Sequence, residues 1–574
     1  MENPRTMLKT ITHFLLCGAL FLAFACGCAF SPGIRPSAEA PPPEQYSAQA
    51  GYRYSLAVLA RLNGDLNGAI GHLKQALALN PDSPYLATEL VSLYIENNAN
   101  DLALALGEAA LARNPGNSEL RSIMGGLYFN LRQYDKAIRE YQAVIRLDAD
   151  NQVAYLYLAT IYAEEKKYKE AEDAYRRMLE IDPENVIGMF YYAKTLTQME
   201  RPAQAEALYA KIIARRPAFE AAWLSLAALY EAQKKYDEAI GVYRRYLGVN
   251  PARQNLRAKI GDLQVKAGRP SEAEKEFKDL LAVDPSNREI HTALGLLYYD
   301  MQRFGDAAAE FSALLETAPG DDKVRYLLAN ALEQKGDGQK AQEEYGRISP
   351  GFELYMNAQI HAAMISKKAG KMTDAVAVMV RAVAKRKDQP VAYLYLSSLY
   401  EETRDLAAAE KTVREGLGLF PRNTDLLYVL GMLQEKSGRF DDSIRTMEKV
   451  LDIDPQNADA LNFIGYSYAD RGMRLDEAEE MIVQALKLKP DNGYILDSMG
   501  WVLFKKGKVA GALQYLKKAL EYLPEDAGIL EHLGDAYLET GKREEALEHY
   551  RRALEKQPDN NLLIRKIDSL KQTK

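Results

Sequence analysis

The sequence predicts an all-α fold: a right-handed superhelical solenoid of about fifteen helical pairs, closed by a capping helix at the C-terminus. Three observations predict it. A proline-containing turn recurs every 34 residues, one slot in each repeat always holds a small residue, and Ala, Leu, Glu, Lys and Arg dominate the composition. With 574 residues, the chain exceeds the length at which a single hydrophobic core stops growing, so it must divide into domains or stack repeats.

The recurring turn has the form Asp/Asn-Pro-x-Asn, and its prolines mark the period of the chain. Most of them are 34 residues apart, the wider gaps are 68 or 102 residues, and one gap is 35 residues. They are Pro81, Pro115, Pro183, Pro217, Pro251, Pro285, Pro319, Pro421, Pro455, Pro490, Pro524 and Pro558. A fixed period of this length is the signature of stacked helical pairs, each of which buries its apolar face against its neighbours.

The twentieth slot of the repeat tests this prediction, because two helices that cross closely need a small residue where they meet. Every repeat has a small residue there: Ala69, Ala103, Ala137, Ala171, Ala205, Ala239, Ala273, Ala307, Ala341, Ala375, Ala409, Ser443, Ala478, Ala512 and Ala546. The eighth slot is small in fourteen repeats, and Val91 is the exception. The two slots therefore predict a close crossing inside each pair.

The slots of the last repeat carry a resemblance to a known family. They hold Leu530, Leu533, Gly534 and Tyr537, then Ala546, Tyr550 and Ala553, then Pro558. This pattern resembles the tetratricopeptide repeat, in which a helix A packs antiparallel to a helix B. The resemblance implies a repeat array over residues 50–558, followed by a capping helix and tail over residues 559–574.

Two segments interrupt the array. Residues 345–353 shorten a second helix and insert Pro350 and Gly351. Residues 470–476 lengthen the turn between the two helices of another pair. The first segment either changes the superhelix curvature or marks a subdomain boundary, or it is a tolerated loop variant, because loops absorb insertions at little cost.

The N-terminal segment has the order of a secretory signal, which predicts a signal peptide over residues 1–27. Arg5 and Lys9 precede an uncharged apolar run, and the run ends at two cysteines. A small residue before such a cysteine resembles the lipobox of bacterial lipoproteins, which implies lipidation of Cys28, with Cys26 as the alternative. An uncleaved transmembrane anchor and simple secretion are the other two interpretations.

The segment after these cysteines predicts where the protein resides. Residues 28–49 are rich in Pro, Ala and Ser and predict an extended tether. No Asp follows either cysteine, which by analogy with enterobacterial sorting predicts an outer-membrane lipoprotein that faces the periplasm. Anchoring in the inner membrane is the alternative. In either case we expect contact with the membrane through the lipid alone.

The composition argues against several functions. The formal charge is −7 and charges of both signs alternate, so we expect no nucleic-acid partner. The three cysteines all lie within the first 28 residues, and the six histidines lack the spacing of metal ligands. Phosphate-cradling loops and nucleophile elbows are absent. We therefore expect no catalytic residue, no metal site, no cofactor and no enzymatic activity.

Aromatic residues in the C-terminal repeats are the candidate binding site. In a tetratricopeptide array, slots 2, 5, 9 and 12 of helix A line a groove that holds peptides. The aromatic residues in those slots are Tyr428, Tyr466, Tyr494, Trp501 and Phe504. The alternative is that they pack between neighbouring A helices. No repeat has Lys in slot 5, so a clamp for a C-terminal carboxylate is not expected.

A narrower resemblance lies in the same region. The segments Asn462–Gly472, Leu475–Glu479 and Ile495–Phe504 resemble a group of Gram-negative lipoproteins that carry long tetratricopeptide arrays. A pseudomonad member of that group binds and activates a periplasmic carboxyl-terminal processing protease, a serine enzyme that trims cell-wall hydrolases. The resemblance implies a non-catalytic scaffold whose partners are proteins or peptide segments, including such a protease and its substrates. The alternative is an assembly factor for exopolysaccharide or for secretion or pilus machinery.

Overall fold

The computed structural model describes residues 47–572, and within them every regular element is a helix. The chain falls into two compact units, which meet between Ala252 and Arg253. The proposed signal peptide, both candidate lipidation cysteines and nearly all of the proposed tether lie outside the described residues. The first helix begins at Ala48, two residues before the predicted start of the array.

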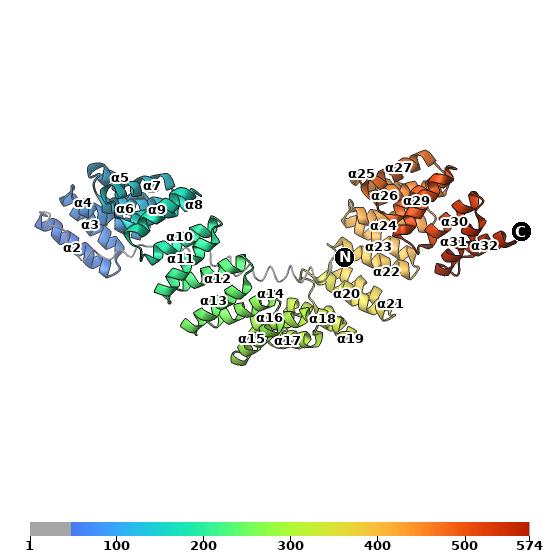
Figure 1. Ribbon diagram of the computed structural model, residues 1–574, viewed down its shortest axis with the longest axis horizontal. Helices are drawn as coiled ribbons and strands as arrows, with labels where there is room; N and C mark the ends of the chain where they lie inside the picture. Colours follow the sequence, from blue (N-terminus) through green and yellow to red (C-terminus); the bar gives the residue numbers. More distant parts are fainter. Residues whose placement is uncertain (1–46, 573–574) are drawn as a thin grey trace. The chain divides into compact units, whose positions relative to one another are not determined.

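Unit 1 consists of six helical pairs, drawn from blue to green in Figure 1. Its helices are α2 (Ala48–Leu62), α3 (Leu66–Leu79), α4 (Pro84–Glu96), α5 (Asn100–Arg113), α6 (Ser118–Asn130), α7 (Tyr134–Leu147), α8 (Gln152–Glu164), α9 (Tyr168–Ile181), α10 (Val186–Gln198), α11 (Pro202–Arg215), α12 (Glu220–Ala232) and α13 (Tyr236–Val249). The even-numbered helix of each pair is helix A of the repeat, and the odd-numbered helix is helix B.

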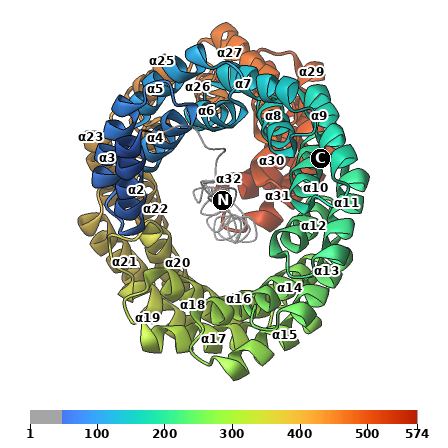
Figure 2. The same cartoon turned by 90° about the vertical axis from the view of Figure 1, so that its left-hand side faces the viewer.

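Unit 2 consists of nine further pairs and a last helix. Its helices are α14 (Asn255–Lys266), α15 (Pro270–Val283), α16 (Arg288–Asp300), α17 (Phe304–Thr317), α18 (Asp322–Lys335), α19 (Gly338–Arg347), α20 (Tyr355–Lys368), α21 (Met372–Lys385), α22 (Pro390–Glu402), α23 (Leu406–Leu419), α24 (Thr424–Lys436), α25 (Phe440–Ile453), α26 (Ala458–Asp470), α27 (Leu475–Leu488), α28 (Gly493–Lys505), α29 (Val509–Tyr522), α30 (Ala527–Glu539), α31 (Arg543–Lys556) and α32 (Asn561–Gln572). The fifteen pairs confirm the predicted fold class. In this unit the A helices α16, α18 and α20 lie on the inner side of the curve, and the B helices α15, α17, α19 and α21 lie on its outer side (Figure 2).

The recurring turn motif works as a helix cap. Its Asn residue precedes helix A, and the side chain accepts a hydrogen bond from the backbone N–H three residues later, as Asn457 does from Ala460 over 3.0 Å. This bond satisfies one of the backbone donors that the first turn of a helix leaves unpaired. The same cap starts the A helices at Asn117, Asn151, Asn185, Asn287 and Asn423. The motif therefore fixes where these six A helices begin.

The small slots lie where the two helices of a pair cross. All fifteen residues of the twentieth slot are 0% exposed, which confirms the predicted close crossing. Glycine in the eighth slot is equally confined. A Cβ atom built on Gly465 would lie 3.0 Å from the backbone carbonyl oxygen of Ala478 and 2.6 Å from Ile482. Larger side chains would push the helices apart, so these slots set the geometry of the pair.

Each turn between helix A and helix B contains a residue with positive φ, and the turn before α27 contains two, Gly472 and Arg474. Eight repeats place Gly there, as at Gly64 and Gly541. The other seven place an exposed L-residue in the left-handed conformation, with φ between 56° and 62°: Asn98, Arg132, Lys166, Glu200, Lys234, Gln302 and Arg404. An L-residue in this conformation is strained by contact between its Cβ atom and the following carbonyl oxygen.

Both predicted irregularities are local. Helix α19 has 10 residues where the B helices before and after it have 14, and its loop is tied down by Arg386, which donates to the carbonyl oxygens of Pro350 and Phe352. The turn before α27 contains Arg474 in the left-handed conformation. The chain divides into its two units elsewhere, after Ala252.

The last helix covers the open end of the stack. Helix α32 packs on α31 and buries Leu563, which is 0% exposed, and Ile567, which is 4% exposed. A terminal cap of this kind keeps an apolar repeat face out of water. Within residues 47–572, no helix combines the length and the apolar character that a membrane crossing requires.

A polar contact recurs inside the pairs that carry a basic residue in slot 4. Arg121 donates to Glu140 in slot 23 over 2.6 Å and to the carbonyl oxygen of Pro115 over 2.8 Å. His291 makes the same two contacts, to Glu310 over 2.6 Å and to the carbonyl oxygen of Pro285 over 3.0 Å. The contact ties helix A to helix B and to the preceding turn.

A second polar contact recurs between successive pairs. A Glu in slot 21 accepts from a basic residue four positions later and from an Arg 29 positions later, in the next repeat. Glu274 does so from Lys278 and Arg303, each over 2.7 Å. The other two sets are Glu172 with Arg176 and Arg201, and Glu410 with Arg414 and Arg439. These carboxylates therefore link three of the repeats to their successors.

Candidate functional site

Four rings from three consecutive A helices of unit 2 come together and form what we call the inner cluster. It consists of Tyr466 on α26, Trp501 and Phe504 on α28, and His532 on α30. Trp501 and Phe504 are three residues apart, which places them on the same face of the helix. The 34-residue register of the array then brings the corresponding faces of α26 and α30 alongside.

The rings of the inner cluster are stacked on one another. The centroids of Trp501 and His532 are 3.9 Å apart with their planes at 18°, and those of Trp501 and Phe504 are 5.1 Å apart at 11°. Tyr466 lies against His532 with a centroid distance of 6.1 Å. The indole N–H of Trp501 donates to Asp470 over 3.3 Å, and the Lys505 amine lies 4.7 Å above the indole ring. Trp501 is only 7% exposed, so it is mainly a packing residue.

One member of the inner cluster, His532, also forms a buried ion pair with Asp497. The Nδ1 atom of His532 lies 2.9 Å from an Asp497 carboxylate oxygen, and both side chains are about nine-tenths buried. Burial by itself lowers the pKa of His532, but the carboxylates of Asp497, Asp535 and Glu531 outweigh burial and raise the pKa. The imidazole is therefore held toward its charged form, which satisfies the buried carboxylate.

Acidic side chains continue beyond the ion pair toward the C-terminal cap. Glu531 and Asp535 on α30 both accept from the Lys566 amine of α32, over 2.8 Å and 2.7 Å. Asp535 also accepts from the hydroxyl of Tyr550 over 2.6 Å. The capping helix therefore neutralises part of this acidic edge and fixes α30 in place.

The structure brings together three of the five predicted groove residues, Tyr466, Trp501 and Phe504. Tyr428 lies on α24 instead, in edge-to-face contact with Phe463 at 6.1 Å. Tyr494 begins α28 and is 57% exposed, and it joins none of the ring contacts found within residues 47–572. Tyr494 is thus the predicted aromatic residue that is most available to a partner.

Sequence analysis missed three polar members of this site: Asp470, Asp497 and His532. His532 and Asp497 are 35 residues apart, one repeat plus one residue, so their proximity emerges only from the register of neighbouring A helices. A further polar atom, Oδ1 of Asn462, is buried on α26 without a hydrogen-bond partner in the described part of the chain. Asn462 precedes Tyr466 by one helical turn and therefore lies on the same face.

The contacts described at this site are ring stacking, an ion pair and hydrogen bonds. The hydrogen bonds of His532 within residues 47–572 are to Asp497 alone, so no hydroxyl or thiol stands beside the imidazole as a nucleophile would. The same residues contain no group of three or more His, Cys, Asp or Glu side chains that could hold a metal ion. The stacked rings and buried carboxylates instead form a rigid surface.

Comparison with known families agrees with the repeat pattern. Family models described as tetratricopeptide repeat match residues 60–122, 124–186, 162–230, 220–263, 259–322, 292–351, 428–493 and 498–561, which together make up more than half of the chain. These models describe the repeat itself.

Individual proteins are similar over shorter stretches. The TPR repeat-containing protein PA4667 of Pseudomonas aeruginosa is 33% identical over 198 residues, which are 34% of this chain and 33% of that protein. The aspartyl/asparaginyl beta-hydroxylase of Mus musculus is 22% identical over 199 residues, 33% of this chain and 27% of that protein. The matched region thus spans a third or less of either relative. Among solved structures, the Cut9–Hcn1 hetero-tetramer of the APC/C has a TM-score of 0.36 at 12% identity, covering 91% of this chain and 96% of that chain.

Proposed function

Since this chain belongs to the tetratricopeptide-repeat family, we propose that it is a non-catalytic scaffold that binds peptide segments of other proteins on the A helices α26, α28 and α30. The observation that carries this proposal is the convergence of aromatic and acidic side chains from three successive A helices. Stacking buries Trp501 and fixes the helices that present the half-buried rings of Tyr466 and Phe504 and the exposed ring of Tyr494. Aromatic rings held in place in this way are typical of interface hot spots.

The polar groups of the site suggest what a bound segment would offer. Within residues 47–572, Oδ1 of Asn462 accepts from no donor. The acidic side chains Asp470, Asp497, Glu531 and Asp535 outnumber the nearby basic side chains Lys505, His532 and Lys566. A segment that presents N–H donors and a basic side chain would complement this surface. The exposed ring of Tyr494 would contact an apolar residue of the same segment.

Binding of an isolated partner to paired variants tests this proposal. Tyr494→Ala should weaken binding while leaving the fold intact, because its ring is exposed. Lys518→Ala, an exposed residue of the partner helix α29, is the matched control and should bind normally. If Tyr494→Ala and a folded Asn462→Leu variant both bound the partner with unchanged affinity, α26, α28 and α30 would be rejected as the binding surface.

We propose further that the partner is a periplasmic carboxyl-terminal processing protease, which the scaffold brings to its substrates. The resemblance of residues 462–472 and 495–504 to lipoproteins of that kind supports this role. A pull-down from cell-envelope extracts should recover a serine processing protease. Recovery of exopolysaccharide, secretion or pilus components in its place would favour the alternative role as an assembly factor.

The anchoring of the scaffold is a separate proposal. We place it in the cell envelope, held at the outer membrane by a lipid on Cys28 or, alternatively, on Cys26, with the repeats in the periplasm. Radiolabelled palmitate should label the wild-type protein and Cys26→Ala but not Cys28→Ala. If Cys28→Ala were labelled and Cys26→Ala were not, the lipid would be assigned to Cys26. If none of the three proteins were labelled, a lipid anchor would be excluded.

A further inference from the structure

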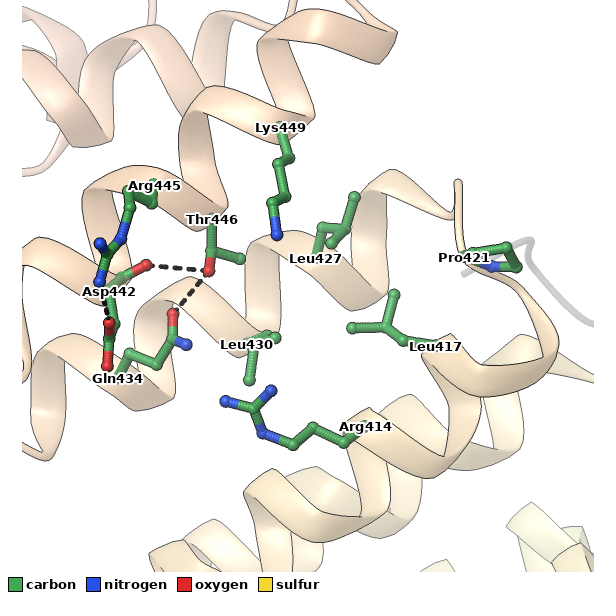
Figure 3. A pocket seen from close by; sticks show the side chains of 10 residues that line it. All are labelled: Arg414, Leu417, Pro421, Leu427, Leu430, Gln434, Asp442, Arg445, Thr446 and Lys449. Carbon is green, nitrogen blue, oxygen red and sulfur yellow. Dashed lines mark hydrogen bonds and ion pairs between the residues drawn. The ribbon is translucent and has the colours of Figure 1, made fainter.

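A cavity of about 450 Å³ opens in unit 2 between the B helices α23 and α25, with helix α24 as its floor (Figure 3). It lies on the B-helix side of the stack, whereas the inner cluster lies on A helices further along the chain. Its lining residues are Arg414, Leu417, Pro421, Leu427, Leu430, Gln434, Asp442, Arg445, Thr446 and Lys449. A concavity of this volume falls in the range of sites that hold small ligands or short peptide segments.

One feature beside the cavity is the absence of Tyr from slot 11, which this repeat shares with six others. Eight repeats carry Tyr there, and the ring fills the space beside the preceding helix B: Tyr298 donates to Glu274 of that helix over 3.0 Å, and Tyr128 donates to Glu108 over 2.6 Å. Here the residue is Gln434, whose side chain is shorter. Slots 4 and 23 hold Leu427 and Thr446, so the basic residue and Glu that join these slots in other repeats are also missing.

The amide of Gln434 has a donor to spare. Its residue is 4% exposed, and its Oε1 atom accepts from the hydroxyl of Thr446 over 2.8 Å. The amide nitrogen donates to no group in the described part of the chain. Figure 3 shows this nitrogen turned toward Leu430, into the cavity. Because this nitrogen borders the cavity, a ligand that accepts from it would gain a hydrogen bond between apolar walls.

The charges around the cavity favour an anion. Arg414 is partly engaged by Glu410 over 2.8 Å, and Arg445 is paired with Asp442 over 2.6 Å. Lys449 is exposed and makes no ion pair within residues 47–572, and its amine points into the same space (Figure 3). Three cations therefore stand against two carboxylates, Glu410 and Asp442, which leaves one positive charge without a partner. Because Asp442 would repel a dianion, the balance suits a ligand with a single negative charge.

The remaining walls are apolar. Leu427 and Leu430 form the floor, and Leu417 and Pro421 close one end. A ligand that fits must combine one anionic group with aliphatic surface. We propose that this cavity binds a peptide segment in which a carboxylate side chain lies between aliphatic residues. The carboxylate accepts from the Gln434 amide and pairs with Lys449, and the aliphatic side chains cover the leucine floor. The scaffold then carries a second binding site, independent of the inner cluster.

The test uses the full chain and short fluorescein-labelled peptides followed by fluorescence anisotropy. The peptides differ only at the centre, which is Glu, Gln, Lys or phosphoserine between leucines. The Glu peptide should bind at least about tenfold more tightly than the Gln and Lys peptides. Equal binding of all four peptides, or no binding of the Glu peptide, would overturn the proposal. If the phosphoserine peptide bound more tightly than the Glu peptide, the cavity would prefer a phosphate. The proposed carboxylate ligand would then be rejected.

Two variants locate the site on the protein. Gln434→Tyr restores the side chain that eight other repeats carry, so it should fold, fill the cavity and abolish binding of the Glu peptide. Lys449→Glu should weaken binding at least about tenfold through charge reversal. The matched control is Lys518→Glu, since Lys518 occupies the same slot in α29 and is exposed. Equal effects of Lys449→Glu and Lys518→Glu, or full binding by Gln434→Tyr, would contradict this location.

Discussion

The His532 imidazole lies face to face with the Trp501 indole, with ring centroids 3.9 Å apart. Its Nδ1 atom, at the ring edge, donates to the buried carboxylate of Asp497. This arrangement connects α28 to α30 through one side chain. The predicted aromatic residues therefore differ in role. Trp501 is buried in the stack and packs, whereas Tyr494 is exposed on the same helix and is available to a partner. Stability and partner binding should therefore respond to different residues.

Removing His532 should destabilise unit 2. His532→Ala leaves the Asp497 carboxylate buried without a partner and is expected to lower the free energy of unfolding by about 3–5 kcal/mol. The chain has two tryptophans, Trp223 in unit 1 and Trp501 in unit 2, so Trp501 fluorescence in a Trp223→Phe background reports urea unfolding of unit 2. Tyr494→Ala is the control and should change the midpoint little. A midpoint for His532→Ala equal to that of the control would contradict a structural role for the pair.

The contact made by His291 should depend on pH. Its two ring nitrogens both donate, which requires the charged form; burial lowers its pKa, but Glu310 and the carbonyl oxygen of Pro285 outweigh burial and raise it. A pKa raised by folding means that the stabilisation is fully present below the unfolded-state pKa of about 6.5 and is lost as the pH rises through the folded-state value.

The variant His291→Arg isolates this effect, because Arg121 and Arg325 make the same contact with a charge that does not titrate in this range. Urea midpoints of unit 2 should fall between pH 6 and pH 9 for the wild type and fall less for His291→Arg. Parallel pH profiles for the two proteins would show that the His291 contact does not titrate.

Adding one methyl group in the eighth slot should separate the helices of a pair. The new Cβ atom in Gly465→Ala would press on the carbonyl oxygen of Ala478, and the expected loss is about 1–3 kcal/mol of unfolding free energy. Gly241→Ala is the control, because Gly241 lies within α13 with open space around it. That change should instead stabilise unit 1 by about 0.5–1 kcal/mol. Losses of equal size in both variants would contradict the crowding at Gly465.

The left-handed turn residues should tolerate glycine. Lys234→Gly relieves the contact between Cβ and the carbonyl oxygen and should raise the stability of unit 1 by about 1 kcal/mol, as measured by Trp223 fluorescence in urea. The comparison is Lys235→Gly, at the next residue, where φ is −85° and glycine offers no relief. Stabilisation of Lys235→Gly, or destabilisation of both variants, would show that the turn is not strained.

Much of the fold could be predicted because the same sequence pattern, and with it the same helical pair, recurs fifteen times. The small residues from Ala69 to Ala546 fixed the crossing of every pair, and all are fully buried. The left-handed turns were less visible, since residues such as Arg132 and Lys166 occupy seven of them where glycine is expected. The division after Ala252 had no signal in the 34-residue spacing, which continues across it.

The site was predicted less completely because its members belong to different repeats. Tyr466, Trp501 and Phe504 were found by their slots, but the partnership of Asp497 and His532 depends on how neighbouring A helices align. The cavity beside Gln434 could not be found from slot 11 alone, because seven repeats lack Tyr there and Gln264 occupies that slot in another repeat. Periodicity reveals what the repeats share, whereas contacts between side chains of different repeats become visible only in the structure.

Within each unit, a helical pair contacts chiefly the pairs before and after it, so neither unit has a centre on which all of its parts depend. Duplication of one 34-residue segment would therefore insert a new layer without redesigning the existing ones. The distance along the array between two binding surfaces on either side of the new layer would then increase by the height of one repeat. Evolution can adjust the reach of such a molecule by copying, and can adjust what it recognises by changing a few side chains in one layer.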